Sequence, residues 1–243
     1  MRLKKWDKLP EQFKTEKVKK YYDYLRKKRV SLFFKRAFDV VVSLIMLAIL
    51  LPVFILLAIA IKIDSKGPVF FRQTRVTQYG KTFRIFKFRT MVTDAEKIGA
   101  QVTTKGDARI TRVGKFIRKC RLDEVSQLID VLRGTMTFVG TRPEVPKYVD
   151  KYEEEMLATL LLPAGITSET SIYFKDEDEL MQNAENPDEK YINEVLPIKM
   201  KYNLQSIKKF GFFHDIKVMF MTVFAMLGKD YTPKENIHEK EDD

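Results

Sequence analysis

An uncharged apolar run over residues 40–61 constrains the fold of this chain more than any other feature. It holds 22 residues, of which only Ser43 and Pro52 are neither aliphatic nor aromatic. The core helix of a soluble protein rarely stays apolar on all sides for so long, and such a run is typical of a membrane helix. At about 1.5 Å per residue it reaches roughly 33 Å, enough to span the hydrocarbon core of a bilayer.

Pro52 lies in the middle of this run and opposes a straight crossing. A proline inside a helix removes one backbone hydrogen bond and clashes with the carbonyl four residues earlier, so a kink is expected. Basic residues flank the run on both sides: Lys35, Arg36, Lys62 and Lys66. The positive-inside rule therefore draws both ends to the cytoplasm. We expect a re-entrant membrane helix over residues 37–63, broken at Pro52, with a single crossing as the alternative.

The N-terminal segment is strongly basic. Residues 1–36 carry +10 of the formal net charge of +11. A basic segment directly before a membrane helix is attracted to the anionic lipids of the inner membrane. Nucleic-acid binding is the alternative, because Tyr21, Tyr22 and Tyr24 offer rings for base stacking. The position beside the apolar run favours lipid, and we expect no nucleic acid as a partner.

The sequence lacks the residues that several other classes of function require. Cys120 is the single cysteine, so no disulfide forms within the chain. The only histidines, His214 and His238, do not favour a zinc site. The chain contains no G-x-x-x-x-G-K-[ST] phosphate loop, no G-x-G-x-x-G fingerprint and no G-x-S-x-G nucleophile elbow. The function must therefore depend on other motifs.

Residues 67–91, "GPVFFRQTRVTQYGKTFRIFKFRTM", predict a β-hairpin. The stretch is rich in Val, Phe, Thr and Tyr, basic residues alternate along it, and Tyr79-Gly80 gives a turn. Its cationic side chains either face phosphates or form a half-solvated ribbon at the membrane surface.

Residues 122–133 predict a helix with two acids in its first turn. Apolar residues recur there at helical spacing, and Gly134 is a suitable C-terminal stop. Asp123 and Glu124 then lie at the helix N-terminus, about 100° apart, so one carboxylate can face a substrate while the other holds a metal. The alternative is an ordinary helix start, where acids complement the macrodipole.

The last third of the chain carries weaker signals. Residues 163–174 predict a turn leading into a strand, and residues 191–210 a helix that Pro197 breaks. The Asp-x-Asp pattern at 176–178 lies in a very acidic stretch, where a solvated loop is the favoured interpretation. Residues 212–228 are apolar but interrupted by charge, which suits an interfacial or core helix.

A series of short motifs follows in a recognisable order. They are "KRAFD", the apolar run with its proline, "GPVFFRQ", "KFRTM", "RITRVGKFIR", "RLDEVSQLIDVLRG", "FVGTRPE" and "HDIKVMFMT". Over about residues 35–228 the chain thereby resembles the bacterial sugar transferases, the monotopic phosphoglycosyl transferases. The resemblance implies transfer of a sugar 1-phosphate from a UDP-sugar to polyprenyl (undecaprenyl) phosphate, with release of UMP and with Mg²⁺ as cofactor. It implies the first membrane step of glycoconjugate, exopolysaccharide or capsule assembly, on the cytoplasmic face of the bacterial inner membrane.

The resemblance also assigns roles to individual residues. Asp123 matches the family's nucleophile, which forms a covalent phosphosugar-aspartyl intermediate, and Glu124 matches its Mg²⁺ ligand. Arg118 matches a phosphate-binding arginine of the family, and Arg142 matches the arginine of a Pro-Arg-Pro motif near the nucleotide. Asp215 matches the acid of a "DIK" element late in the chain, which the resemblance places among the phosphate- and nucleotide-binding residues. The sequence departs from the family pattern at three positions: Leu51 before the proline, Arg121 before the dyad, and Thr141 for the first proline of Pro-Arg-Pro.

The expected architecture is α+β. It comprises a basic juxtamembrane arm (1–36), a re-entrant membrane helix (37–63), a largely helical cytoplasmic catalytic domain with a small β-hairpin or sheet (64–230), and a polar tail (231–243). A homodimer is one possible assembly. The alternative function is a non-catalytic membrane-anchored scaffold or lipid-binding protein. The sequence does not identify the sugar.

Overall fold

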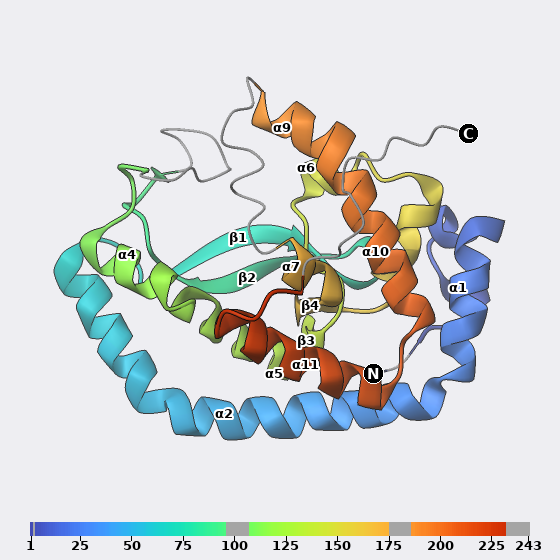
Figure 1. Ribbon diagram of the computed structural model, residues 1–243, viewed down its shortest axis with the longest axis horizontal. Coiled ribbons are helices and arrows are strands. Elements are labelled where there is room, and N and C mark those ends of the chain that lie inside the picture. The colour runs from blue at the N-terminus through green and yellow to red at the C-terminus, as the bar shows by residue number, and fades with distance from the viewer. Residues whose placement is uncertain (2, 96–106, 175–185, 232–243) are drawn as a thin grey trace.

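The computed structural model describes residues 1, 3–95, 107–174 and 186–231. Two short two-stranded sheets lie inside a body of helices, and the long helix α2 runs along one side of that body (Figure 1). The predicted α+β class, mostly helical with small sheets, is confirmed. In chain order the elements are η1 (Trp6–Lys8), η2 (Glu11–Phe13), α1 (Glu16–Lys27), α2 (Arg29–Asp64), β1 (Phe70–Val76), η3 (Gln78–Gly80), β2 (Thr82–Phe88), α4 (Arg112–Lys119), η4 (Leu122–Gln127), α5 (Leu128–Arg133), β3 (Met136–Val139), α6 (Pro146–Val149), η5 (Glu154–Leu161), β4 (Ala164–Thr167), α7 (Glu169–Tyr173), α9 (Pro187–Lys190), η6 (Tyr191–Val195), α10 (Leu196–Lys208) and α11 (Phe212–Met226).

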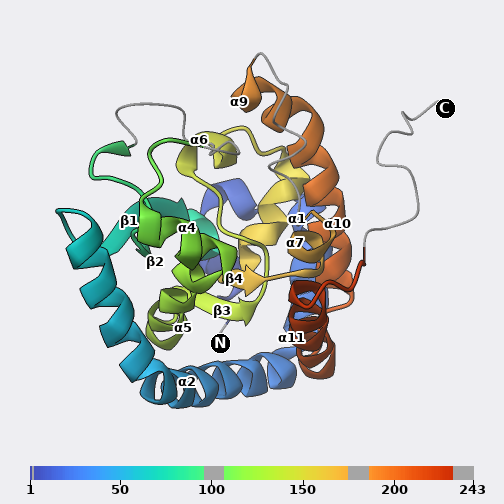
Figure 2. The same cartoon turned by 60° about the vertical axis from the view of Figure 1, so that its left-hand side comes forward.

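The apolar run forms most of α2, a single helix of 36 residues. This helix is long and apolar enough to cross a membrane. It changes direction along its length, as Figures 1 and 2 show, and Pro52 is the proline inside it. A proline kinks a helix by removing a hydrogen bond and displacing a carbonyl. The helix continues on both sides of Pro52, so the proline does not end it.

Both halves of α2 pack against the same body. Before the proline, Phe38, Val42 and Leu50 contact a core cluster that includes Leu128 and Phe138. After the proline, the helix contributes to a second cluster, made with the hairpin and α4; its main members are Val53, Phe54, Leu57, Ile61, Phe88 and Ile117. The outward side of α2 exposes more than half of each of several large apolar side chains: Val41, Leu44, Ile45, Ile49, Leu51, Ile55, Leu56 and Ile59. The helix therefore has one protein-facing and one open apolar side.

Three polar residues of the "KRAFD" motif attach α2 to the body. Lys35 donates to the Val139 carbonyl at 2.8 Å and forms a buried ion pair with Asp215 of α11. Asp39 accepts hydrogen bonds from Thr137 Oγ1 at 2.7 Å and from the backbone N–H of Phe138 at 3.3 Å. Arg36 donates to the last carbonyls of α5 and so caps that helix. These contacts fix α2 against β3, α5 and α11.

The predicted β-hairpin is confirmed. Strands β1 and β2 pair antiparallel, with Phe70 opposite Phe88 and Val76 opposite Thr82. At the turn, Tyr79 and Gly80 both have positive φ, 61° and 75°. Arg89, directly after β2, donates to the carbonyls of Ser65 and Lys66, which follow the end of α2, and thereby attaches the hairpin to that helix.

The predicted strand after residue 163 is also present, as β4 parallel to β3. Gly165 on β4 lies so close to Gly140 that an added Cβ would be 2.2 Å from the Gly140 nitrogen and oxygen. Only glycine fits at that distance, since real Cβ atoms keep at least about 3 Å from such backbone atoms. The close approach holds the segment after β3, which leads to Arg142, against β4.

Two predicted helices differ in detail. Residues 122–133 form a 3₁₀ segment, η4, followed by the short α5, instead of one α-helix. The prediction that Pro197 breaks a helix is wrong. A π-helical turn, η6, precedes α10, and Pro197 lies in the first turn of α10, where its missing N–H is tolerated. The Asp-x-Asp pattern at 176–178 and the tail from residue 232 lie outside the described residues.

The N-terminal segment is part of the core. Val18, Tyr21, Tyr22 and Leu25 of α1 are almost fully buried in a cluster that includes Leu161 of η5. Because Tyr21 and Tyr22 are buried, their rings do not form the exposed stacking platform that the nucleic-acid alternative needs. The cations of α1 remain on the outside of the molecule.

Candidate active site

The sharp junction between α4 and η4 positions the acidic pair. Arg121 adopts a left-handed conformation with φ of 54°, which is uncommon for a residue with a side chain. The chain then enters the 3₁₀ turn that carries Asp123 and Glu124. This turn lies against β2, the second strand of the hairpin.

Lys87 of β2 joins the two carboxylates. Its Nζ lies 2.9 Å from Glu124 Oε1 and 3.7 Å from Asp123 Oδ2. Arg142 contacts both oxygens of Glu124, one through Nη1 at 3.2 Å and the other in an ion pair through Nη2. These four residues, Lys87, Asp123, Glu124 and Arg142, form the dyad cluster. The Asp123 and Glu124 side chains are 15% and 17% exposed, so the cluster is partly shielded from water.

The two carboxylates differ in electrostatics. Burial raises the pKa of Glu124, but Arg142 and Lys87 outweigh it and bring that pKa well below its ordinary value. Burial likewise raises the pKa of Asp123, with a further contribution from Glu124, and here Lys87 and Arg118 only partly oppose the rise. Glu124 is thus held as a fixed anion, while Asp123 is the less stabilised anion and the one with fewer direct partners.

Arg118 approaches the dyad cluster from α4. Its Nε donates to Thr90 Oγ1 at 2.8 Å, and its charge lowers the pKa of Asp123. Gly114 makes this approach possible, because a Cβ there would lie 2.0 Å from the Thr90 carbonyl oxygen. Helix α4 therefore lies directly on the end of the hairpin, with Arg118 near Asp123.

A buried polar network lies next to Arg142 in sequence. Glu144 accepts a 2.6 Å hydrogen bond from Tyr191 and pairs with Lys199 at 3.4 Å. Arg75 of β1 donates to the Pro143 carbonyl at 3.1 Å. Burial raises the pKa of Glu144, but Lys199, Tyr191 and Arg75 bring it below its ordinary value. This network gives the segment around Arg142 a rigid support.

The structure thus brings together most of the predicted site residues. Asp123, Glu124 and Arg142 are in contact, and Arg118 lies nearby. Asp215 lies elsewhere, in the ion pair with Lys35 that attaches α2. Its role at the nucleotide stays a prediction. Sequence reasoning missed Lys87 as a member of the site. The available signal was the alternation along β2, which puts Lys87 on the same face as the buried Ile85.

The donor set suits magnesium better than zinc. Among the described residues no group of three or more His, Cys, Asp or Glu side chains gathers that could hold a metal by itself. Mg²⁺ is usually held by one or two carboxylates together with substrate phosphates. Glu124 supplies such a carboxylate, and it is held ionised. The residues therefore fit a magnesium ion that binds together with a phosphorylated substrate.

Three curated relatives cover most of this chain. A UDP-N-acetylgalactosamine-undecaprenyl-phosphate N-acetylgalactosaminephosphotransferase from Aeromonas hydrophila is 34% identical over 80% of this chain and 44% of its own length. A UDP-glucose:undecaprenyl-phosphate glucose-1-phosphate transferase from Escherichia coli is 34% identical over 78% and 39%. A transferase of the same name from Caulobacter vibrioides is 32% identical over 81% and 70%. The chain thus spans less than half of the first two relatives.

The family comparison covers nearly the whole chain. Residues 30–229, which include α2, the hairpin, the dyad cluster and α11, match the family model described as "Bacterial sugar transferase". The resemblance noted in the motifs is confirmed, and the chain belongs to the bacterial sugar transferase family.

Proposed function

We propose that this chain transfers a sugar 1-phosphate from a UDP-sugar to polyprenyl phosphate, releasing UMP. The dyad cluster carries this proposal: a carboxylate nucleophile and a fixed second carboxylate lie together among the cations Lys87, Arg118 and Arg142. An anionic nucleophile can attack an anionic diphosphate only if nearby positive charge offsets their repulsion. The cluster supplies both parts.

The reaction proceeds in two displacements at one phosphorus. A carboxylate oxygen of Asp123 attacks the sugar-bearing phosphorus, the bond to the UMP phosphate breaks, and a phosphosugar-aspartyl intermediate forms. A phosphate oxygen of the polyprenyl phosphate then attacks the same phosphorus and releases the Asp123 carboxylate. Arg118 and Arg142 bind phosphate oxygens through planar guanidinium groups, for which the bidentate geometry is well suited.

Glu124 would hold Mg²⁺ when substrate is present. The ion would offset the negative charge on the diphosphate and on the departing UMP. Lys87 partly neutralises both carboxylates and lies closer to Glu124 than to Asp123. Glu124 then stays fixed while Asp123 faces the substrate. Partial burial of both side chains limits access of water to the acyl phosphate.

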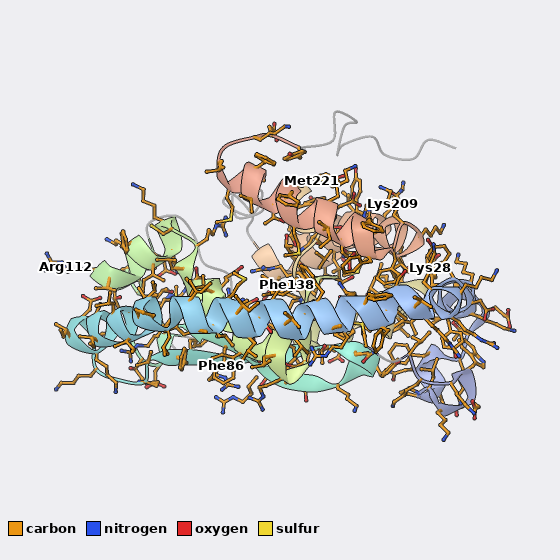
Figure 3. All side chains as sticks on the ribbon, turned by 90° about the horizontal axis from the view of Figure 1, so that it is seen from below. Lys28, Phe86, Arg112, Phe138, Lys209 and Met221 are labelled. Carbon is orange, nitrogen blue, oxygen red and sulfur yellow. The ribbon has the colours of Figure 1, made fainter. Side chains whose placement is uncertain are left out.

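The site works at a membrane surface in this proposal. Helix α11, which lies beside α2 (Figure 3), also exposes large apolar side chains: Phe213, Phe220, Val223, Phe224 and Met226. Both halves of α2 pack on one body, which supports a re-entrant, monotopic helix, since a crossing helix would carry one half away from that body. A lipid-borne acceptor and a cytosolic UDP-sugar then meet on the cytoplasmic face, at the start of a lipid-linked glycan.

Cysteine labelling tests the re-entrant helix. The exposed Cys120 is first replaced by Ser, and single cysteines are then introduced by Lys27→Cys and Lys66→Cys, on either side of α2. An impermeant maleimide should label neither site in intact spheroplasts and both after permeabilisation. The reference variant Asp150→Cys should give the same result. If either flank is labelled from outside, α2 spans the membrane.

An assay of UMP release tests the function. Purified full chain in nanodiscs with undecaprenyl phosphate and Mg²⁺ should release UMP from at least one member of a panel of UDP-sugars. The panel contains glucose, galactose, N-acetylglucosamine, N-acetylgalactosamine and diamino sugars as UDP derivatives. When the lipid phosphate is omitted, turnover should stop, and the only UMP released should be that freed when the aspartyl intermediate forms. Failure with every donor would favour the alternative, a membrane-anchored scaffold without catalysis.

A further inference from the structure

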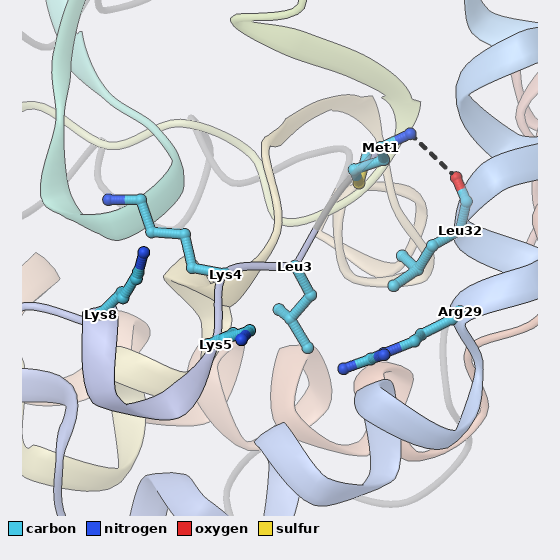
Figure 4. A pocket seen from close by; sticks show the side chains of 7 residues that line it. All are labelled: Met1, Leu3, Lys4, Lys5, Lys8, Arg29 and Leu32. Atoms are coloured by element: carbon cyan, nitrogen blue, oxygen red, sulfur yellow. Dashed lines mark hydrogen bonds between the residues drawn. The ribbon is translucent and has the colours of Figure 1, made fainter.

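A separate cavity lies between the N-terminal segment and the first turns of α2. Its volume is about 730 Å³, within the range of pockets that hold small ligands. The residues that line it are Met1, Leu3, Lys4, Lys5, Lys8, Arg29 and Leu32 (Figure 4). None of them belongs to the dyad cluster. Helix α1, near the cavity, and helix α4, near the dyad cluster, lie at opposite ends of the body (Figure 1).

The lining of this N-terminal cavity combines cationic and apolar side chains (Figure 4). Lys4, Lys5, Lys8 and Arg29 supply four positive charges, and no carboxylate occurs among the described residues that line it. Four like charges around one cavity repel each other, and a bound anion would offset that repulsion. Met1, Leu3 and Leu32 form the apolar part.

The cations stand on a fixed framework. The backbone N–H of Lys4 donates to Tyr79 Oη at 2.9 Å, and its carbonyl accepts from Tyr22 Oη at 3.0 Å. Trp6 packs on Tyr22 with ring centroids 5.0 Å apart. The segment before η1 is thus attached to the hairpin turn and to α1. A mobile basic tail would attract anions diffusely, whereas here the backbone that carries these lysines is held in place.

The cavity also adjoins the apolar surface that we assign to the membrane. Arg29 and Leu32 belong to the first turns of α2, and in those turns Val30, Phe33 and Phe34 are 70%, 66% and 54% exposed. A ligand in the cavity would therefore contact these cations and lie next to the apolar surface of α2. A free phosphate would make no use of the apolar part.

We propose that this cavity binds the anionic headgroup of a membrane phospholipid. The four cations hold the phosphodiester, and the apolar residues contact the glycerol and the first methylene groups. This inference rests on the proposed membrane contact of α2 and not on the transfer reaction. It replaces a diffuse attraction of the basic segment by one defined site.

Quenching of Trp6, the single tryptophan of the chain, tests the proposal directly. The full chain in neutral-detergent micelles is titrated with phosphatidylglycerol or phosphatidylcholine, each brominated on its acyl chains. Phosphatidylglycerol should quench the Trp6 fluorescence saturably. Its half-maximal concentration should be lower than that of phosphatidylcholine by about five-fold or more. Lys5→Gln, Lys8→Gln and Arg29→Gln combined should remove this preference and leave UMP release in detergent unchanged.

The control variant combines Lys19→Gln, Arg26→Gln and Lys27→Gln, three exposed cations of α1 that do not line the cavity. It loses the same charge and should retain the preference for phosphatidylglycerol. Equal loss in both variants would mean diffuse attraction and overturn the proposal. Absence of any preference in the unmodified protein would overturn it as well, and full displacement of the lipid by millimolar inorganic phosphate would assign the cavity to a free anion.

Discussion

Asp123→Asn should reduce UMP release by a factor on the order of 10⁴ or more, because an amide cannot form the acyl phosphate. The fold should survive this change. Burial raises the pKa of Asp123, which means that the folded protein favours the neutral form of this side chain, and asparagine is a neutral isostere. Lys87 keeps its closer partner, Glu124. The thermal unfolding midpoint of the variant should therefore equal or slightly exceed that of the unmodified chain.

A radiolabel on the sugar-bearing phosphorus distinguishes the nucleophile from a merely structural acid. Without acceptor lipid, label should stay on the unmodified protein after denaturation and be absent from the Asp123→Asn variant. Asp150→Asn, an exposed acid at the end of α6, is the matched control and should keep both label and turnover. Retention of label by the Asp123→Asn variant would show that another residue forms the covalent bond.

The elements that the sequence predicted well depend on local patterns. The apolar run, the alternation in the hairpin and the acids before an apolar helix all appear within about 25 residues, so residue spacing alone indicates them. The internal form of the helix at 122–133 was less predictable. An apolar residue at every third position fits one turn of a 3₁₀ helix as well as one turn of an α-helix, so the sequence pattern does not distinguish them.

Contacts between distant segments could not be predicted in the same way. Lys87 meets Glu124 across 37 positions, and Lys35 meets Asp215 across 180. No local pattern encodes such pairs. The N-terminal segment is a different case, because Val18, Tyr21, Tyr22 and Leu25 recur at helical spacing and thus indicated a buried face. The cations occupy the opposite face, so the net charge of the segment gives no indication of the buried one.

Lys35→Met should lower the free energy of unfolding by about 3–5 kcal/mol, the typical cost of breaking a buried ion pair from one side. The Lys35 and Asp215 side chains are 4% and 11% exposed, and Asp39, the other carboxylate of this region, is also buried. Removal of the lysine leaves Asp215 without its cation. Urea or thermal unfolding in detergent measures the loss. Lys147→Met, in the exposed pair with Asp188, is the matched control and should cost at most about 1 kcal/mol.

The double variant Lys35→Met and Asp215→Leu should recover most of that loss. Burial raises the pKa of Asp215 although Lys35 opposes the rise, so the cost of desolvation exceeds the attraction within the pair. Two apolar side chains carry neither the desolvation cost nor the attraction. The same variants decide what Asp215 does. If it attaches α11 to α2, the double variant keeps the KM for the UDP-sugar close to that of the unmodified chain. A KM raised by about ten-fold or more, with stability restored, would instead place Asp215 at the nucleotide.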